Sequence, residues 1–190
     1  MSVRLSLLAL LDQGPCYGYQ LRAELDWRTG SRGPINVGQI YNTLDRLERD
    51  KLVRKTGENN YYEITPRGSA EVATWFASAS PAAELPAKLA LAATLPGVDV
   101  ASVVRAQRAA AAAVAARSVD PLTVANLAVA VLARADGAAA AAEQRLLDDV
   151  DELMALGIAP RPLSSEVPRR GRPAKTTAPD GSATSAGSAA

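Results

Sequence analysis

Histidine is absent from the 190-residue chain, and cysteine occurs once, at Cys16. Without histidine there is no Ser-His-Asp triad, no Cys-His dyad and no imidazole ligand for a metal ion. A single cysteine forms neither an internal disulfide nor a thiolate metal cluster. Gly-rich phosphate loops and clustered carboxylates are missing as well, so the sequence predicts neither an enzyme nor a bound cofactor.

Long hydrophobic runs are also absent, since no segment approaches the roughly 18 apolar residues of a membrane span. The apolar start of the chain is short, contains Asp12 and lacks a small-residue cleavage site. We therefore interpret it as a core helix rather than a signal peptide, and expect no membrane partner. Aromatic residues make up 4% of the chain, which favours closely packed helices.

Composition divides the chain into three segments, expected to be separate domains. Residues 1–80 combine helical patterns with one strand-like hairpin and carry ten basic and nine acidic side chains, a net charge of +1. Residues 81–160 are helix-forming, with six basic and nine acidic side chains, or −3. Residues 161–190 carry five basic and two acidic side chains, a net charge of +3. The rest of this segment is mostly Pro, Gly, Ser, Thr and Ala, which predicts a disordered basic tail.

The first segment predicts a winged helix-turn-helix. Helices are expected near residues 3–13, 17–27 and 37–50, the third beginning at an Asn36 N-cap. Strands at 52–56 and 61–65 flank a turn at 57–60, and Thr65-Pro66 begins a fourth helix. Three helices, a hairpin wing and a helix make a mainly α fold, followed here by an all-helical C-terminal domain.

The third helix is expected to bind double-stranded DNA. Val37, Ile40, Leu44 and Leu47 form its apolar stripe, and the opposite stripe is basic and amide-rich. Amide and guanidinium groups pair with purine edges in the major groove, although an ordinary solvated face is the alternative explanation. With the wing included, the expected DNA-binding residues are Asn36, Gln39, Tyr41, Asn42, Thr43, Arg46, Arg49, Arg54, Lys55, Asn59 and Asn60.

Four sequence blocks, in order and spacing, resemble the PadR family of transcriptional regulators. They are residues 8–11 (LALL), 14–21 (GPCYGYQL), 38–48 (GQIYNTLDRLE) and 61–68 (YYEITPRG). The helical segment, beginning with residues 88–92 (KLALA), resembles the C-terminal domain of the longer PadR subgroup. This resemblance implies a homodimer that represses a nearby promoter, with release by a small-molecule effector in some members.

Two positions depart from the family pattern. Lys51 stands where the family often has glycine, and lysine in a left-handed conformation costs roughly 1 kcal/mol. The end of the third helix and the approach of the wing are therefore left open. Tyr17 stands where the family often has histidine, which excludes a histidine-based effector contact there.

The helical segment predicts dimerisation. We expect one helix over residues 102–117 and another from Pro121, with Gly137 either breaking the next stretch or lying inside a continuous helix. Alanine-rich helices bury little area each, so a long interface between two copies supplies stability; a monomeric helical cap is the alternative. Two recognition helices related by a two-fold axis would read a palindromic operator.

The remaining candidates lie outside the recognition helix. The tail segment at residues 169–175 resembles an AT-hook, whose candidate DNA contacts are Arg169, Arg170, Gly171, Arg172 and Pro173. General phosphate contact and a merely solvated tail are the alternatives. Trp27, Trp75 and Phe76 could line an effector pocket, although core packing near the domain junction is the favoured role; Cys16 is interpreted as a packed residue.

The sequence as a whole predicts a homodimeric transcriptional regulator that represses by binding DNA in the cytoplasm, associated with the nucleoid. Two other functions stay open. A winged helix can serve as a protein-interaction module, and the near-neutral first segment is compatible with that. An architectural DNA-binding protein would instead use the basic tail without regard to sequence.

Overall fold

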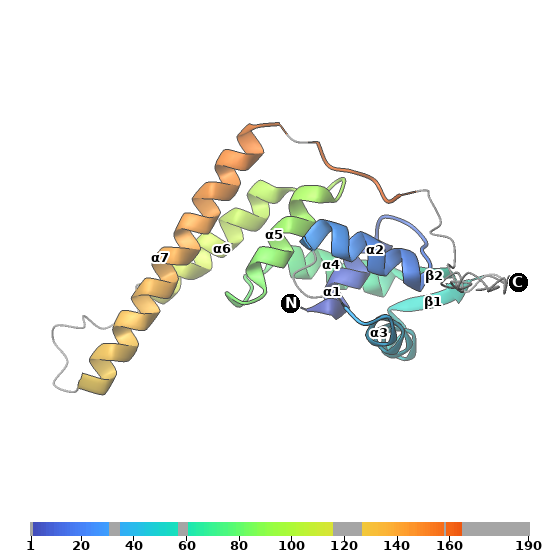
Figure 1. Ribbon diagram of the computed structural model, residues 1–190, viewed down its shortest axis with the longest axis horizontal. Coiled ribbons are helices and arrows are strands. Elements are labelled where there is room, and N and C mark those ends of the chain that lie inside the picture. Colours follow the sequence, from blue (N-terminus) through green and yellow to red (C-terminus); the bar gives the residue numbers. More distant parts are fainter. Residues whose placement is uncertain (1, 31–34, 57–60, 116–126, 158, 165–190) are drawn as a thin grey trace, which may run out of the picture.

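The computed structural model describes residues 2–30, 35–56, 61–115, 127–157 and 159–164. The elements are α1 (Val3–Leu11), α2 (Gly18–Thr29), α3 (Val37–Arg49), β1 (Val53–Thr56), β2 (Tyr61–Ile64), α4 (Pro66–Ala77), α5 (Leu85–Thr94), α6 (Val100–Ala115) and α7 (Leu127–Ala155). Helices α1–α4 and the hairpin gather at one end of the molecule, and α6 and α7 form a long arm at the other (Figure 1).

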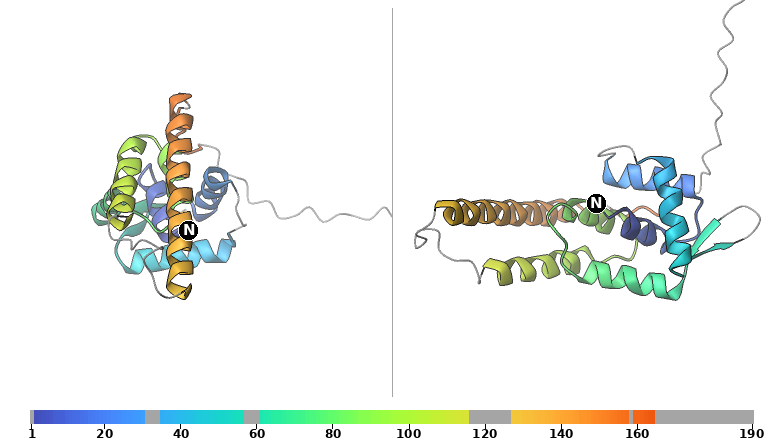
Figure 2. Two further views of the ribbon diagram at one scale, coloured as in Figure 1. Left: turned by 90° about the vertical axis from the view of Figure 1, so that its left-hand side faces the viewer. Right: turned by 90° about the horizontal axis from the view of Figure 1, so that it is seen from below.

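The N-terminal elements form the winged helix-turn-helix that the sequence predicts. Strand β1 pairs antiparallel with β2, placing Val53 opposite Ile64 and Thr56 opposite Tyr61. The hairpin projects beyond the helices as a wing, next to α3 (Figure 2). The mainly helical fold class is therefore confirmed, and the predicted strands agree with the observed ones to within one residue at each end.

Local capping chemistry sets where α3 and α4 begin. The Asn36 side chain accepts a 2.9 Å hydrogen bond from the Gly38 N–H, and so caps α3 as predicted. The Thr65 hydroxyl accepts from the Gly68 N–H at 3.2 Å, while Pro66 occupies the first turn of α4, where its missing N–H costs nothing.

Helix α3 ends in a Schellman motif built around Lys51. The Leu52 N–H donates to the Leu47 carbonyl and the Lys51 N–H to the Glu48 carbonyl, both at 2.9 Å. Lys51 has φ of 59°, the left-handed conformation that favours glycine. The sequence analysis did not predict how this helix ends. The structure shows that it ends in the left-handed turn that glycine favours, although lysine occupies the position. The buried Leu52 then leads directly into the wing.

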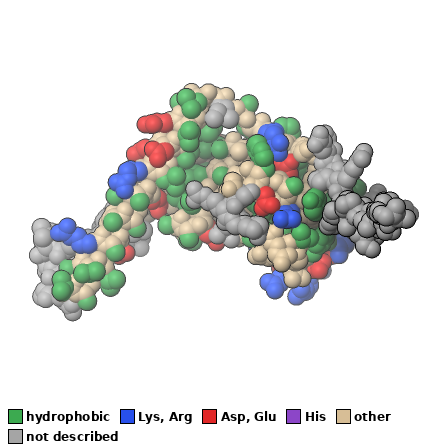
Figure 3. Space-filling view, viewed as in Figure 1, with side chains coloured by type: hydrophobic (Ala, Val, Ile, Leu, Met, Phe, Trp, Pro, Cys, Tyr) green, Lys and Arg blue, Asp and Glu red, His purple; other side chains and the backbone are tan. Residues whose placement is uncertain are grey.

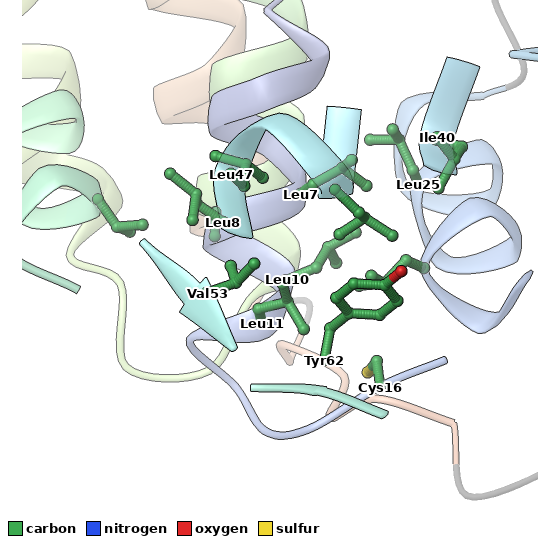
Figure 4. Packing of buried hydrophobic residues seen from close by; sticks show 14 of the residues in the cluster. Leu7, Leu8, Leu10, Leu11, Cys16, Leu25, Ile40, Leu47, Val53 and Tyr62 are labelled. Carbon is green, nitrogen blue, oxygen red and sulfur yellow. The ribbon is translucent and has the colours of Figure 1, made fainter. Parts of the chain in front are cut away.

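A leucine-rich core joins α1 to the elements around it. Leu7, Leu8 and Leu10 are fully buried and lie among side chains from α2, α3 and the wing (Figure 4). Cys16 is packed into this cluster, as expected, and its backbone pairs with Tyr62 in an isolated bridge. Burial raises the pKa of the Cys16 thiol to about 12, with a smaller contribution from the Glu24 charge.

Helix α5 connects this core to the helical arm. Its Leu91, together with Leu95, packs into the N-terminal core, whereas Leu85 and Leu89 pack with Val103 of α6 and with α7 in a second cluster. The predicted boundary at residue 80 therefore precedes a helix that contributes to both cores.

The arm consists of two helices lying side by side (Figure 2). Helix α7 has 29 residues and spans about 43 Å at 1.5 Å per residue. It continues through Gly137, which settles the choice between a break and continuity. Helix α6 begins at Val100, two residues before the prediction, and the predicted start at Pro121 lies outside the described residues.

After α7 the chain turns back toward the N-terminal domain. Residues 159–164 run in an extended conformation toward the wing (Figure 1), and Leu163 packs against the N-terminal core. The prediction that disorder begins at residue 161 is therefore wrong for residues 161–164. The AT-hook-like segment at 169–175 lies outside the described residues. No described helix is long and apolar enough to cross a membrane.

Candidate nucleic-acid interface

Helix α3 presents two chemically different faces. Ile40, Leu44 and Leu47 are fully buried on the inner face, which fixes the rotation of the helix about its axis. Val37 is only partly buried at the first turn. The outer face is consequently held in a defined orientation toward solvent, and basic side chains lie over α3 at the lower edge of the molecule (Figure 3).

Four side chains of the outer face carry unused hydrogen-bonding groups. Within the described ranges of the chain, none of these side chains forms a hydrogen bond or ion pair, and all are exposed: Gln39, Asn42, Arg46 and Arg49. Their spacing of three or four residues places them on one stripe. The stripe can therefore donate to, and accept from, a partner without breaking any internal contact.

Three other predicted site residues on or beside α3 have structural tasks. The Asn36 side chain is engaged in the N-cap, and the Thr43 hydroxyl donates to the Gln39 carbonyl at 2.7 Å. Tyr41 packs on α2 so closely that a β-carbon at position 18 would lie 2.7 Å from its ring carbon Cε1. Gly18 therefore allows α2 and α3 to approach, while the Tyr41 side chain keeps more than a third of its surface exposed.

The two basic side chains of the wing are already paired. The Arg54 guanidinium contacts the Glu63 carboxylate across the hairpin at 2.9 Å. Lys55 Nζ lies 3.0 Å from Glu48 and 3.5 Å from Asp45, both on α3. The hydrogen bond to Glu48 raises the pKa of Lys55, which keeps the ammonium charged. These lysine contacts tie the wing to α3; Asn59 and Asn60 lie outside the described residues.

A tyrosine pair, which no sequence pattern predicts, also joins α2 to the wing. The rings of Tyr17 and Tyr61 lie 3.8 Å apart, centroid to centroid. The neighbouring Tyr61 side chain raises the pKa of Tyr17. The Cys16 N–H and the Tyr62 carbonyl pair at 3.0 Å beside them. The start of α2 is thus fixed to strand β2 of the wing.

The three candidate effector-pocket aromatics do not lie together. Trp75 and Phe76 are in contact, with ring centroids 4.8 Å apart. Trp27 is instead 54% exposed and stacks with the Arg161 guanidinium, so core packing is wrong for this residue. Its position follows from α2, where Leu21 and Leu25 share the buried face and Trp27 lies off it.

Two hollows lie where the N-terminal domain meets the helical arm. One, of about 320 Å³, is lined by residues of α1, α4, α6 and the segment before α6, including Phe76, Val98 and Val103. A larger groove of about 630 Å³ lies between the end of α2, α5 and α7. Among the described residues, no group of three or more His, Cys, Asp or Glu side chains is arranged to hold a metal ion.

Comparison with known proteins gives one family match. Residues 7–74 match the transcriptional regulator PadR-like family, and no curated protein sequence matches the chain. The structure of the Vibrio cholerae virulence activator AphA is similar at 20% identity, covering 82% of this chain and 97% of that one, with a TM-score of 0.37.

Two structures of Bacillus subtilis PadR are similar as well. The one in complex with operator DNA has 16% identity, 80% and 98% coverage of the two chains and a TM-score of 0.37. The other has 14% identity, 80% and 97% coverage and a TM-score of 0.35. These likenesses are loose over the whole chain, so the assignment depends on the family match. The match over residues 7–74 supports the resemblance of the N-terminal domain to the PadR-like family of transcriptional regulators.

Proposed function

We propose that the protein regulates transcription by binding duplex DNA through α3. The observation that carries this proposal is the outer stripe of Gln39, Asn42, Arg46 and Arg49, which has no hydrogen-bonding or ionic partner among the described residues and is held outward by the buried inner face. Amide side chains pair with adenine edges and guanidinium groups with guanine edges. A helix with these groups uncommitted is suited to the major groove.

Base and phosphate contacts divide along the helix and the wing. Gln39, Asn42 and Arg46 would contact bases, with Thr43 adding a hydroxyl, while Tyr41 and Arg49 would contact phosphates. Arg54 lies on the wing with its guanidinium paired to Glu63, and an exposed pair of this kind exchanges partners at little cost. Asn36 supports the site by capping the helix that presents it.

We further propose that two copies assemble through the helical arm. Exposed apolar side chains near both ends of α7 support this: Leu127, Val129, Val131, Leu132, Leu153 and Leu156. Leu127 is 80% exposed and Leu156 is 72% exposed, and exposed apolar side chains grouped at the ends of a long helix are typical of an interface. A two-fold dimer would place two α3 helices on a palindromic operator and repress by occupying the promoter.

The hollow between α1, α4 and α6 is the candidate site for a small-molecule effector. Its volume of about 320 Å³ falls at the lower end of the range for ligand sites, about 300–1,000 Å³. Apolar walls from Val72, Phe76 and Val103 surround it, with Asp12 and Gln13 at the edge. A ligand there would contact both the DNA-binding domain and the arm, and could change their relative position.

The decisive experiment is a mobility-shift titration on the DNA upstream of the protein's own gene and on random DNA, repeated across salt concentrations. We expect tighter binding to the upstream DNA and a linear fall of log affinity with log salt. Footprinting of the bound fragment should show two half-sites about one helical turn apart, or a multiple of that. Absence of binding at low salt would favour a protein-interaction module, and equal binding to both DNAs an architectural role.

A further inference from the structure

The chain after α7 is fastened along α2 by hydrogen bonds to its main chain. Residues 159–164, here called the strap, run from the end of α7 toward the wing (Figure 1). The Arg161 N–H donates to the carbonyl of Thr94, the last residue of α5, at 3.0 Å. The Arg28 guanidinium of α2 donates to the Arg161 carbonyl at 2.8 Å and to the Thr94 carbonyl at 2.5 Å. One buried side chain therefore joins α2, α5 and the strap.

A buried ion pair lies beneath the strap. Glu24 and Arg28, both almost fully buried, are joined at 3.1 Å, and the Arg161 guanidinium adds a second contact to Glu24 at 3.2 Å. The same guanidinium stacks on the Trp27 ring, 3.8 Å from its centroid. Because buried charges need complete sets of partners, these contacts fix the strap at one place along α2.

The strap ends beside the contact between α2 and α3. The Gln20 side-chain amide donates to the Ser164 carbonyl at 2.7 Å, and the Ser164 N–H donates to Glu24 at 2.9 Å. Gln20 lies in the first turn of α2, two residues after Gly18, on which the Tyr41 ring of α3 packs. The strap is therefore tied to the part of α2 that carries α3.

An open groove separates α7 from the end of α2. Its volume is about 630 Å³, and its lining includes Arg28 of α2 together with Leu153 and Met154 of α7. Because the walls of an unfilled space lack partner atoms across it, the groove leaves α7 room to tilt relative to α2. The strap limits this movement, since Arg161 follows Ala155, the last residue of α7, by six residues, a reach of at most about 22 Å.

Resting on the proposed dimer and its DNA-binding function, we propose that the strap positions α3 relative to the arm and thereby sets the spacing between half-sites that the dimer accepts. The arm joins the two copies and α2 carries α3, so a restraint between α7 and α2 fixes the distance and angle between the two α3 helices. Each base pair added between half-sites moves one of them by about 3.4 Å and turns it by about 34°. A restrained pair of helices can follow that shift only by deforming the DNA.

Operators that differ in spacer length test the proposal in the full-length chain. Single base pairs are added or removed between the half-sites, and a duplex with one half-site is the reference. For the unaltered chain, a change of one base pair should weaken binding by roughly tenfold or more. The variant Gln20→Ala with Trp27→Ala removes a hydrogen bond and the stacking that hold the strap, and it leaves net charge and α3 unchanged. Its loss should be smaller by about threefold or more, with single half-site affinity unchanged within about twofold.

Two controls show whether release of the strap is the cause. Hydrogen exchange of the Arg161 and Ser164 amides should become faster on release, because both N–H groups are bonded in the intact strap. Trp27→Phe keeps an aromatic face beside the guanidinium and should retain the spacing preference of the unaltered chain.

A second release variant changes the strap itself. Arg161→Ala with Leu163→Ala removes the contact to Glu24, the stacking on Trp27 and the packing of Leu163 on the N-terminal core. It should reproduce the relaxed spacing preference. Its lost charge cancels, since all spacings are compared within one protein.

Three results would overturn the positioning role while operator binding stands. Released variants that keep the full spacing preference would show that α3 is positioned without the strap. Equal weakening on the single half-site and on every spacing would limit the strap to stabilising α2. An unaltered chain that accepts every spacing equally would show that nothing restrains the two helices. Failure of the unaltered chain to bind DNA would instead overturn the proposed function and the positioning role together.

Discussion

The Thr65 hydroxyl donates a 2.9 Å hydrogen bond to the carbonyl oxygen of Lys51, the left-handed residue two positions after the end of α3. Thr65 also begins α4, so one side chain joins the end of the recognition helix to the helix that follows the wing. Its own N–H bonds to the Leu52 carbonyl at 2.9 Å. The left-handed turn at Lys51 is thus fixed from both sides, which explains why a residue with an unfavourable conformational preference is held there.

Replacement of Lys51 by glycine should stabilise the fold. A non-glycine residue at φ of 59° is strained, and removing that strain outweighs the added entropy of glycine in the unfolded chain, for a net gain of about 0.5–1 kcal/mol in the free energy of unfolding. Chemical denaturation at neutral pH measures it. Lys51→Ala is the matched control, since alanine removes the charge and keeps the strain; an equal gain from alanine would refute the explanation.

Lys55 should support DNA binding by masking acidic groups on α3. Its ammonium contacts Glu48 and Asp45, so Lys55→Gln would leave two carboxylates uncompensated beside the outer stripe and weaken operator affinity. The same substitution in a Glu48→Gln background should cost distinctly less. Mobility shifts on the four proteins measure the difference. Equal losses in both backgrounds would make Lys55 a direct phosphate contact instead.

Local signals account for what the sequence predicted correctly. The caps at Asn36 and Thr65 involve partners two and three residues away, so the chemistry can be read from neighbouring positions. The buried face of α3 follows from the spacing of Ile40, Leu44 and Leu47 in the same way. These local features were enough to predict the winged helix and the orientation of its recognition helix.

The features that the sequence analysis did not predict depend on contacts between residues far apart in the chain. Arg161 contacts Glu24 across 137 positions, and Ser164 contacts Gln20 across 144, so no periodicity predicts that residues 159–164 lie along α2. The stacking of Tyr17 on Tyr61 likewise depends on how α2 and the hairpin pack. The exposure of Trp27 could have been predicted, because the spacing of Leu21 and Leu25 already places it off the buried face of α2.

Cys16 should make stability fall at alkaline pH. Its pKa is about 12 in the folded protein and about 8.5 in an unfolded chain. Between these values the unfolded state loses a proton that the folded state retains, so the free energy of unfolding decreases as pH rises above about 9, by roughly 1.4 kcal/mol per unit at most.

The measurement for Cys16 is the difference between the unaltered chain and Cys16→Ala, by urea denaturation from pH 7 to 10.5. Taking the difference cancels other groups, including Lys88, whose pKa burial lowers and whose contribution therefore has the opposite sign. The alanine variant should show the shallower decline. A constant difference across this range would mean that the folded thiol titrates normally.

Leu132→Glu should separate the proposed dimer. Leu132 is 65% exposed on α7 of the single chain, and a buried carboxylate without a partner would be costly in an apolar interface. Analytical ultracentrifugation should show a monomer with unchanged helical circular dichroism. Leu132→Met, which keeps volume and polarity, should remain dimeric. A chain that is already monomeric without substitution would rule out assembly through this face.

Arg46 and Arg49 should have different effects on DNA recognition. Both are exposed and unpaired among the described residues, but Arg46 lies nearer the middle of the stripe and Arg49 is the last residue of α3. Arg46→Ala should weaken operator binding by about 1–3 kcal/mol and random-DNA binding much less, because a lost guanine contact matters only at the correct base. Arg49→Ala should weaken both about equally and lower the salt slope by about one unit, as loss of a phosphate contact does. Parallel titrations on operator and random DNA measure both variants, and equal losses for Arg46→Ala on the two DNAs would assign it to a phosphate.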